Sequence, residues 1–460
     1  MNMTGYLFTR RHPEYLKNEH AYRHCAEAYR GGTAYMEKTL IRHVSEIDLE
    51  FSERKRRAYY FNYPRSIARR ITQYALAVPP VRSGADPALV EDWSRSGLRT
   101  NEVMRQLSTM LTVFGKVWVH IDSPTFSAPV SRSAAAAKNL RPYVRILSPL
   151  DVTDWSLGSD GKLEWAILRE EHYDNSDPLI PGRLCEYIKL FRRGSWQLFC
   201  RRGNETAEVA AGVLPGSEIP LFPVEESDGS GAGAGHWFED AVRISEAIFN
   251  NESESQMTMV KQMFGLLVVS ESFARGALPR NREENVNFAS TVARSAAVIE
   301  SVEEKGISRY ISPSGVPGTL LRQENEALKR ELFDLAGLST SSYSRDAQSA
   351  ESKAWDFRNS SQFLAARADL LEQTEIRAWE LLHLFDDAIP VPNVVYNREF
   401  DVRELDKSIT SLLQLSELPA GNGFKQSVNK AAVELLAALS PMPEQEKYAL
   451  LEEAENSVRS

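Results

Sequence analysis

The sequence of 460 residues has few of the features that secreted, disulfide-stabilised or membrane proteins depend on. It contains three cysteines and no CxxC pair, which predicts free thiols in a reducing compartment. Cys185 and Cys200 could lie on neighbouring strands, but no pattern indicates that they are bonded. The longest apolar runs are shorter than 18 residues, which excludes a membrane-spanning helix. Residues 1–11 lack the apolar core of a secretion signal.

Positive charge is also scarce. Lys and Arg number 54 against 63 Asp and Glu, and the formal net charge is -9. This balance argues against a broad basic surface that grasps DNA. The hydrophobic share of 42% and the charged share of 25% are typical of a soluble globular protein. The length allows two to four lobes and a sizeable core.

Recognisable catalytic and metal-binding motifs are missing. His20 and His24 have metal-competent spacing, but no third ligand or HExxH glutamate accompanies them, so a solvated helix face is favoured over a zinc site. Three acidic pairs are interpreted as solvated carboxylates at strand or helix ends rather than as paired catalytic acids. They are Asp151/Asp154, Glu170/Glu171 and Asp386/Asp387. We expect no cofactor, no metal and no enzymatic activity.

A glycine-rich stretch at residues 227–235 precedes a predicted helix and could cradle a phosphate. It lacks the Walker Lys-Ser/Thr, and no βαβ unit surrounds it. A flexible hinge is therefore the favoured interpretation. A nucleotide-binding enzyme that uses the loop from Gly229 to Gly235 is the alternative hypothesis.

Basic and aromatic residues alternate between residues 52 and 78, a composition that can bind single-stranded nucleic acid. Within this stretch Ile67, Ile71, Tyr74 and Val78 form a helical apolar stripe, which Pro79-Pro80 ends. A core helix with a basic outer face is therefore favoured over a nucleic-acid site.

The first half of the chain is predicted to be an α+β lobe with a largely antiparallel sheet. Helices are expected at 14–30 and at 100–114, where Thr100 is the N-cap and Gly115 the C-cap. Turn signals at 159–161 and 193–194 predict two hairpins. Strands are expected at 117–121, 143–147, 162–169, 184–191 and 196–201, and a short edge strand with two prolines at 219–224.

Residues 236–385 consist of two helical arms around a small lobe, followed by a third long helix. The arms are 236–263 and 319–335, and the third helix spans 350–385 after a Ser-rich break at 338–349. Because residues 250–256 are polar on every side, that segment must be solvated or face other polar helices. Short strands are expected at 266–269, 296–299 and 307–311. A strand at 393–400 and helices at 402–418, 427–439 and 444–458 follow.

Several short motifs resemble, in order and spacing, those of the portal proteins of tailed bacteriophages. The opening helix is similar around His12-Pro13-Glu14-Tyr15, and the aromatic segment around Tyr59-Tyr60-Phe61-Asn62. Further similarities lie at 115–122, 219–224, 311–315, 320–338, 347–355 and 397–401. The sequence departs from the family pattern at the C-terminus. Only about 45 residues follow the start of the last predicted helix pair, so any crown would be small.

The resemblance implies an α+β portal fold with wing, stem, clip and crown. Residues 1–235 would be the N-terminal part of the wing. Stem helices would be 236–263 and 319–337, and the clip 264–318 between them. A channel (tunnel) loop would span 338–352, and 353–402 would form the long channel-side helix and close the wing. Residues 403–460 would be a small helical crown.

The resemblance also implies a function: a homo-oligomeric ring, about twelve subunits, at one vertex of a capsid in the virion, assembled in the host cytoplasm. Double-stranded DNA would pass through it during packaging and ejection. Its partners would be the terminase large subunit, the head-tail adaptor and the major capsid or scaffold protein. Tyr343, Arg345 and Lys353 would face DNA, and Arg275, Arg280 and Arg282 of the clip would contact partners. Another structural head or adaptor protein is a further alternative.

Overall fold

The computed structural model divides the chain into two compact units, Met1–Asn397 and Arg398–Ser460. The residues that it describes are 3–124, 140–175, 179, 181–203, 205–226, 236–263, 266–270, 297–300, 309–311, 316–338, 350–398, 400, 414–415, 421–439 and 449–454. In the first unit, α+β structure with long helices and mainly antiparallel sheets is confirmed.

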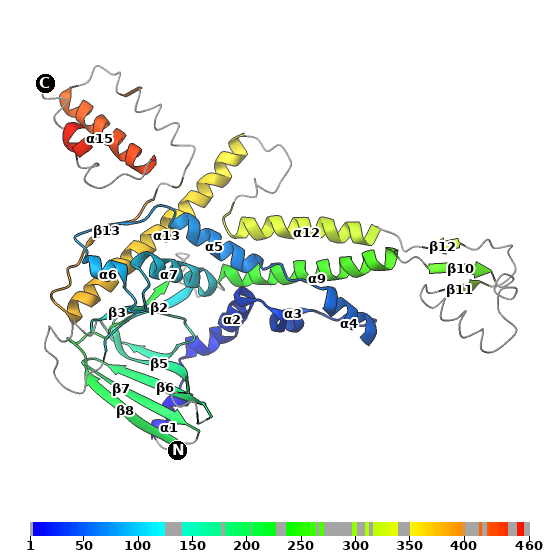
Figure 1. The fold of residues 1–460 in the computed structure, drawn as a ribbon, viewed down its shortest axis with the longest axis horizontal. Helices are drawn as coiled ribbons and strands as arrows, with labels where there is room; N and C mark the ends of the chain where they lie inside the picture. The colour runs from blue at the N-terminus through cyan, green and yellow to red at the C-terminus, as the bar shows by residue number, and fades with distance from the viewer. Residues whose placement is uncertain are drawn as a thin grey trace. The chain divides into compact units, whose positions relative to one another are not determined.

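A group of helices forms the N-terminal part of the first unit (Figure 1). They are α1 (Met3–Thr9), α2 (Pro13–Arg30), α3 (Thr33–Thr39), α4 (Asp48–Arg57), α5 (Tyr63–Ala75), α6 (Pro87–Glu91) and α7 (Thr100–Phe114). The predicted helix 14–30 is confirmed as α2. Its N-terminus is capped by His12, whose ring accepts a hydrogen bond from the Glu14 amide.

The predicted core helix in the basic stretch is confirmed only in part. Ile67 and Ile71 are fully buried, but α5 ends at Ala75, before Pro79-Pro80. Tyr74, in the last turn of α5, is 50% exposed, and Val78, beyond its end, is 46% exposed. The place of both residues in the predicted stripe is wrong. Ala68, Thr72 and Ala75 complete the buried face instead.

The predicted helix 100–114 is confirmed as α7, and Leu107 and Leu111 on its apolar face are fully buried. Its N-cap is Arg99 rather than Thr100, and the Arg99 amide donates to the Glu102 carboxylate at 2.8 Å. Gly115 ends the helix with a φ of 70°, a left-handed conformation that favours glycine. A Cβ at this position would also lie 2.8 Å from the His236 ring.

Two antiparallel sheets follow α7. The three-stranded sheet has the order β3-β2-β9, from β2 (Lys116–Asp122), β3 (Tyr143–Leu147) and β9 (Leu221–Glu225), so β9 is an edge strand as predicted. The five-stranded sheet is a meander of β4 (Val152–Leu157), β5 (Leu163–Asp174), β6 (Arg183–Arg192), β7 (Ser195–Arg202) and β8 (Glu205–Val213). The predicted turns at 159–161 and 193–194 are confirmed, as the β4–β5 and β6–β7 hairpins. The strands β4 and β8 were not predicted.

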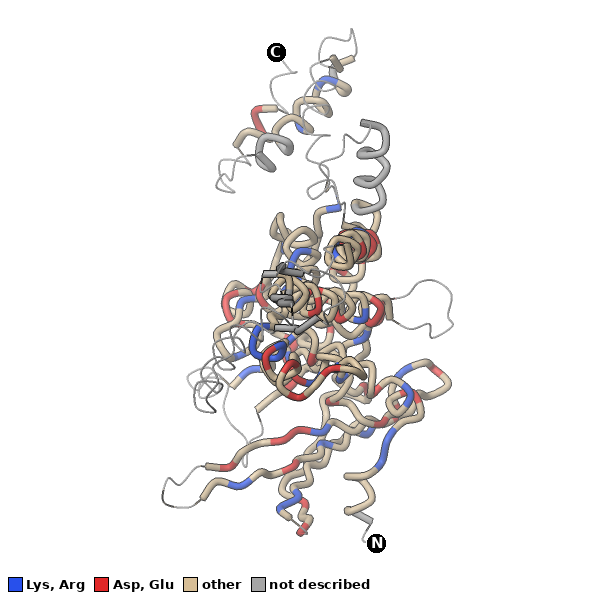
Figure 2. Tube along the Cα trace, turned by 90° about the vertical axis from the view of Figure 1, so that its right-hand side faces the viewer, with Lys and Arg blue, Asp and Glu red and all other residues tan. Residues whose placement is uncertain are grey.

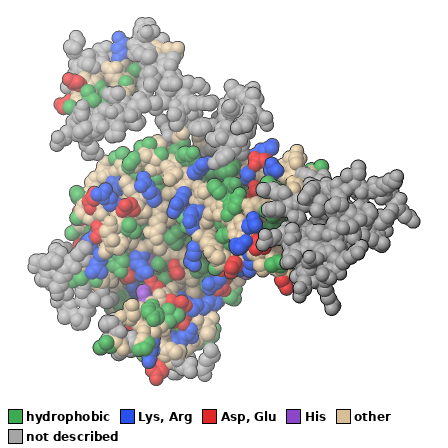
Figure 3. Space-filling view, turned by 45° about the vertical axis from the view of Figure 1, so that its right-hand side comes forward, with side chains coloured by type: hydrophobic (Ala, Val, Ile, Leu, Met, Phe, Trp, Pro, Cys, Tyr) green, Lys and Arg blue, Asp and Glu red, His purple; other side chains and the backbone are tan. Residues whose placement is uncertain are grey.

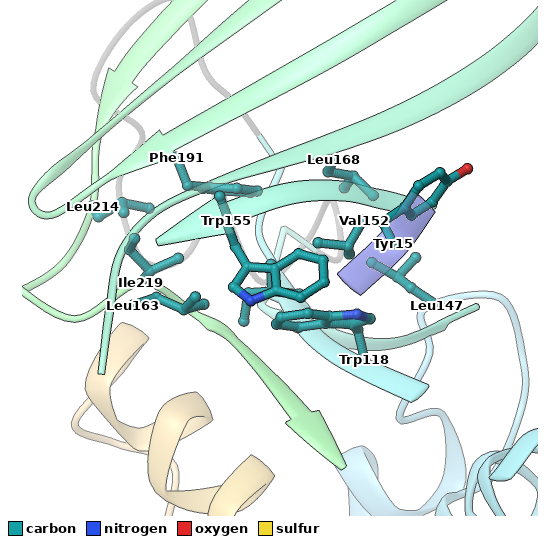
Figure 4. Close-up of a cluster of buried hydrophobic side chains, with 12 residues drawn as sticks. Tyr15, Trp118, Leu147, Val152, Trp155, Leu163, Leu168, Phe191, Leu214 and Ile219 are labelled. Carbon is teal, nitrogen blue, oxygen red and sulfur yellow. The ribbon is translucent and has the colours of Figure 1, made fainter. Parts of the chain in front are cut away.

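A tryptophan pair joins the two sheets. Trp118 from β2 and Trp155 from β4 are 1% and 8% exposed, and their ring centroids lie 5.3 Å apart in an edge-to-face arrangement (Figure 4). Tyr15 from α2 and Phe191 from β6 belong to the same cluster. Because α7 and α13 contact β2 as well, both faces of that strand are buried.

The two predicted arms are α9 (Trp237–Met263) and α12 (Val316–Leu335), which pack side by side (Figure 1). Between them in the chain lies a sheet of order β11-β10-β12, from β10 (Leu266–Ser270), β11 (Ala297–Glu300) and β12 (Arg309–Ile311). β10 pairs in parallel with β11 and antiparallel with β12. The three predicted strands of the lobe are confirmed.

The long third helix is confirmed as α13 (Ala350–Phe385), about 50 Å at about 1.5 Å per residue. It is followed by β13 (Asn393–Val395), shorter than the predicted strand 393–400, which pairs with β1 (Val81–Ser83). In the second unit, α15 (Asn422–Leu439) confirms the predicted helix 427–439 and extends it, and residues 449–454 are helical. Most of the predicted helix 402–418 lies outside the described residues.

Candidate functional site

The candidate site is the α9–α12 helix pair with the long helix α13 beside its base. The contact between α9 and α12 is polar. The Asn251 side-chain amide donates to the Asn325 side-chain oxygen at 3.0 Å, and Asn325 is 1% exposed. Ser253 and Ser255 of α9 are each 2% exposed. The polar segment 250–256 therefore faces another polar helix, one of the two predicted possibilities. This hydrogen bond favours one register of the two helices, because a shift would leave the buried side-chain oxygen of Asn325 without a donor.

Charged side chains border the same contact. The Lys329 ammonium of α12 lies 2.9 Å from Glu326 and 3.9 Å from Glu252 of α9. Lys329 and Glu252 are 27% and 29% exposed, so water screens this attraction and its contribution to stability is small. The Asn251–Asn325 hydrogen bond, rather than these ion pairs, sets the alignment of α9 and α12.

The base of α9 is anchored by Glu246. Its carboxylate accepts from the Tyr35 hydroxyl at 2.6 Å and lies 2.7 Å from His24 Nε2. The hydrogen bond to Glu246 raises the pKa of His24. The predicted solvated face of His20 and His24 therefore holds for His20, which is exposed, but is wrong for His24, which is part of the α2–α9 contact.

The first turn of α9 is held by His236. Its Nε2 lies 2.6 Å from the carbonyl oxygen of Thr112, so Nε2 carries the proton and donates. Burial lowers the pKa of His236, which keeps the ring neutral. The hinge expected at residues 227–235 directly precedes this position and lies outside the described residues.

A second buried network anchors α13. Glu375 is fully buried, and its carboxylate accepts from Arg82 Nη2 at 2.9 Å and from the Tyr396 hydroxyl at 2.6 Å. The Trp379 indole donates to the same carboxylate at 3.2 Å. Burial and the Glu375 charge raise the pKa of Tyr396 well above its ordinary value. Glu375 thereby ties α13 to β1 and to Tyr396, which directly follows β13.

Arg367 makes a further buried connection from α13. Its side chain is 1% exposed, pairs with Glu226 and donates to the Ser108 carbonyl oxygen of α7 at 3.0 Å. Glu226 follows β9 directly. The Arg367 guanidinium thus joins α13, α7 and the end of the three-stranded sheet. Buried ion pairs therefore anchor α13 at two positions, Arg367 and Glu375.

The described structure does not test the six predicted site residues. Tyr343 and Arg345 of the predicted channel loop, and Arg275, Arg280 and Arg282 of the predicted clip, lie outside the described residues. Lys353 lies in the first turn of α13, where only the backbone is described. The Gly229–Gly235 loop is also outside the described residues, so the nucleotide hypothesis stays untested.

The acidic residues Asp151 and Asp154, considered in the sequence as paired catalytic acids, have structural roles. Asp154 was predicted to be a solvated carboxylate, and that prediction is wrong. It is 4% exposed and pairs with Arg10 at 2.5 Å. Asp151 accepts from the Ser148 amide at 2.8 Å, and burial raises its pKa. Among the described residues, no group of three or more His, Cys, Asp and Glu could hold a metal ion, and no helix is long and apolar enough to cross a membrane.

The cysteines are free and buried. Cys185 and Cys200 do lie on neighbouring strands, β6 and β7, but Cys200 pairs across the ladder with Tyr187. The two cysteines are therefore diagonal, about 7–8 Å apart at Cα, too far for a disulfide without backbone movement. The expectation of free thiols is confirmed.

No protein-family model matches the chain, and no curated protein matches it. Among solved structures, the chain is similar to a chain in the neck of a native GTA particle computed with C12 symmetry. The two chains are 10% identical, the match covers 79% of this chain and 88% of that chain, and the TM-score is 0.48. The chain is also similar to a chain in the virion of a native gene transfer agent (GTA) particle, at 12% identity, covering 79% and 88%, with a TM-score of 0.46. A chain in the neck of an empty GTA particle computed with C6 symmetry has 12% identity, coverage of 78% and 87%, and a TM-score of 0.45.

Proposed function

We propose that this chain is a portal-type structural protein of a phage-like particle, and that about twelve copies form a ring around a channel for double-stranded DNA. The observation that supports it best is the order of elements in the first unit. Two antiparallel helices carry a small mixed sheet at their far end, and a long helix follows at their base (Figure 1). Such a projecting helix pair suits a load-bearing part better than an active site.

The proposed parts keep the boundaries expected from the sequence. The wing comprises residues 1–235, closed by the segment after α13. The stem is 236–263 with 319–337, the clip is 264–318, and the crown is 403–460. The stem assignment is supported by α9 and α12, which pack side by side and are joined by the Asn251–Asn325 hydrogen bond. The channel loop, 338–352, leads directly into α13.

The charge distribution fits a conduit. Lys and Arg are interspersed with Asp and Glu along the described chain, as Figure 2 shows, and the net charge is -9. Each phosphate that a protein neutralises adds affinity and salt dependence, which would hold DNA in place. An acidic chain repeated around a channel repels the duplex and lets it slide. Contact with DNA would then be confined to Tyr343, Arg345 and Lys353.

The proposed partners are the terminase large subunit during packaging, the head-tail adaptor afterwards, and the major capsid or scaffold protein around the ring. Arg275, Arg280 and Arg282 of the clip would contact terminase and adaptor. Substituting these three arginines with Ser should leave the ring intact and weaken terminase binding. Unchanged terminase affinity would remove the role assigned to them.

Negative-stain electron microscopy of the purified full chain tests the proposal. A portal-type protein should give rings with a central hole in end views and stacked layers in side views. Tight ATP binding that is lost in Gly231→Pro, without rings, would favour the nucleotide-binding enzyme instead. Filaments or closed shells would favour another structural head protein.

A further inference from the structure

Three carbonyl groups at the end of α7 accept hydrogen bonds from three other parts of the chain. We call these acceptors the α7 joint; they belong to Ser108, Thr112 and Gly115. The donors lie in α13, directly before α9 and directly after β9. They are the Arg367 side chain at 3.0 Å, the His236 ring at 2.6 Å and the Glu226 backbone amide at 2.9 Å. Accordingly, α7 contacts both α9 and α13 (Figure 1).

The α7 joint includes a carbonyl group that its own helix leaves without a partner. The last four carbonyl groups of a helix lie beyond the reach of its regular hydrogen bonds, and Thr112 is one of these residues. Thr112 is fully buried, so its oxygen is shielded from water and accepts from the His236 ring instead. Leaving a buried carbonyl group unpaired costs free energy. This hydrogen bond therefore holds the start of α9 against α7.

The α7 joint also holds the chain on both sides of residues 227–235. Glu226 precedes that segment and His236 follows it. Their acceptors, Gly115 and Thr112, are less than one helical turn apart, about 5 Å along the helix axis. The chain therefore returns to the same end of α7 before α9 begins, and the base of α9 is attached there from both directions.

Arg367 attaches α13 at the same place. Its guanidinium pairs with the Glu226 carboxylate in addition to its hydrogen bond to Ser108. Figure 3 shows many basic side chains at the surface of the first unit, where water screens their charge. The Arg367 side chain is instead 1% exposed, and that of Glu226 is 20% exposed. Removing one partner of such a buried pair is costly, because the other charge is left without compensation.

The side chains that meet at the α7 joint also act on one another through charge. Burial lowers the pKa of His236, while the Glu226 carboxylate raises it and Arg367 lowers it. Burial likewise lowers the pKa of Arg367, and the Glu226 charge opposes that shift. A change at Arg367 therefore alters the electrostatic potential at His236, so α13 and the start of α9 share one low-dielectric environment.

We propose that the α7 joint couples α13 to α9, so that loosening either helix there loosens the other. A direct contact also exists, because the Trp237 and Phe363 rings lie 6.4 Å apart between centroids. Both rings are only half-buried, whereas Thr112 and Arg367 are buried, so the coupling is assigned to the joint. The joint depends on neither a ring nor DNA. In the proposed portal it would link the channel-side helix to the stem, and that consequence alone rests on the proposed function.

Hydrogen exchange of the full chain, measured by mass spectrometry, tests the coupling in both directions. In Arg367→Met, the first two turns of α9 should exchange at least about fivefold faster, although the hydrogen-bond partners of Arg367 lie outside α9. Arg367→Lys keeps a charge beside Glu226 and should accelerate α9 less but still more than about twofold, which decides the matter if the Met variant does not fold. His236→Phe keeps a ring without the donor and should accelerate exchange around Arg367. His236→Gln keeps an N–H donor and should not.

Arg377→Met and Phe363→Leu are the matched controls. Arg377 lies on the same helix and pairs with two glutamates outside α7, and its side chain is 34% exposed. Phe363→Leu removes the direct ring contact between α13 and α9. Both should leave exchange in α9 within about twofold of the unmodified chain. Unchanged exchange of α9 in Arg367→Met, equal acceleration in either control, or equal effects of His236→Gln and His236→Phe would overturn the coupling. Ring formation does not enter these measurements, so a failed ring would leave the α7 joint intact.

Discussion

Glu375 holds three elements of the first unit through one carboxylate, so its charge should be costly to remove. In Glu375→Gln, the guanidinium of Arg82 stays buried but loses its counter-charge. Removing one partner of a buried pair costs about 3–5 kcal/mol. We expect a loss of that size in the free energy of unfolding of the first unit, measured with urea.

Glu380→Gln on the same helix is the control. Glu380 pairs with Arg377 at 2.7 Å, but the two side chains are 47% and 34% exposed. An exposed pair of this kind contributes about 0.3–0.5 kcal/mol. Equal losses for the two variants would show that Glu375 does not act through a buried charge.

His120 should make the protein less stable as the pH falls. The ring is fully buried, neither nitrogen has a hydrogen-bond partner among the described residues, and burial lowers its pKa to about 3. Between the ordinary pKa of about 6.5 and that value, the unfolded chain binds a proton that the folded chain does not. Stability should therefore fall by up to about 1.4 kcal/mol per pH unit from this residue. His120→Phe should lose less stability than the unmodified chain between pH 7.5 and 5.5.

His24 should act in the opposite direction. Its hydrogen bond to Glu246 raises its folded pKa, so its contribution is full below the unfolded pKa and is lost as the pH rises through the folded pKa. His24→Gln should therefore be more destabilising at pH 5.5 than at pH 8. A pH-independent effect, measured by urea unfolding at both values, would show that the ring binds Glu246 without charge.

The individual contacts that position the helices could not be predicted from the sequence. Arg82 and Glu375 are 293 residues apart, and each looks like an ordinary surface charge in its local pattern. The pattern of α2 places His24 on a solvated face, but its ring contacts Glu246 of α9, 222 residues away. Such pairs depend on which elements meet, and a local pattern carries no information on that.

At the scale of elements, the Asn251–Asn325 hydrogen bond should keep α9 and α12 aligned. In Asn325→Ala, the half-buried Asn251 amide loses this hydrogen bond, at a cost of about 0.5–1.5 kcal/mol. Because the loss is local, hydrogen exchange should speed up by up to about tenfold in the paired parts of α9 and α12. Exchange in α7 should change much less.

Gln323→Ala is the control for this variant. Gln323 is exposed on the outer face of α12, and surface substitutions of this kind change stability by about 0.5 kcal/mol or less. If hydrogen exchange in α9 and α12 is equally fast in the two variants, the Asn251–Asn325 hydrogen bond does not set the alignment of the helices.

Elements with strong local patterns could be predicted, and short elements defined by distant partners could not. The helices α7 and α13 have long apolar stripes and clear ends, such as Gly115. The strands β4 and β8 were missed, because the former is short and turn-like in composition and the latter is rich in Ala and Glu. β1 has only three residues and exists because β13 pairs with it.

At the scale of the whole molecule, the segment before α13 should matter for DNA movement rather than for assembly. Deleting residues 339–349 removes Tyr343 and Arg345 but none of the contacts that anchor α13 through Arg367 and Glu375. We expect assemblies of unchanged size and a strong loss of DNA packaging in a particle-based assay. Packaging at the unmodified level would remove the proposed role of the loop.

The proposed ring is the central claim, and the mass of the native assembly tests it most directly. A twelve-subunit ring of this 51.8 kDa chain has a mass of about 620 kDa. Mass photometry of the purified full chain should show one dominant species near that value, or near another whole multiple consistent with a closed ring. A single species at 51.8 kDa at every concentration, confirmed by sedimentation at higher protein concentration, would contradict it.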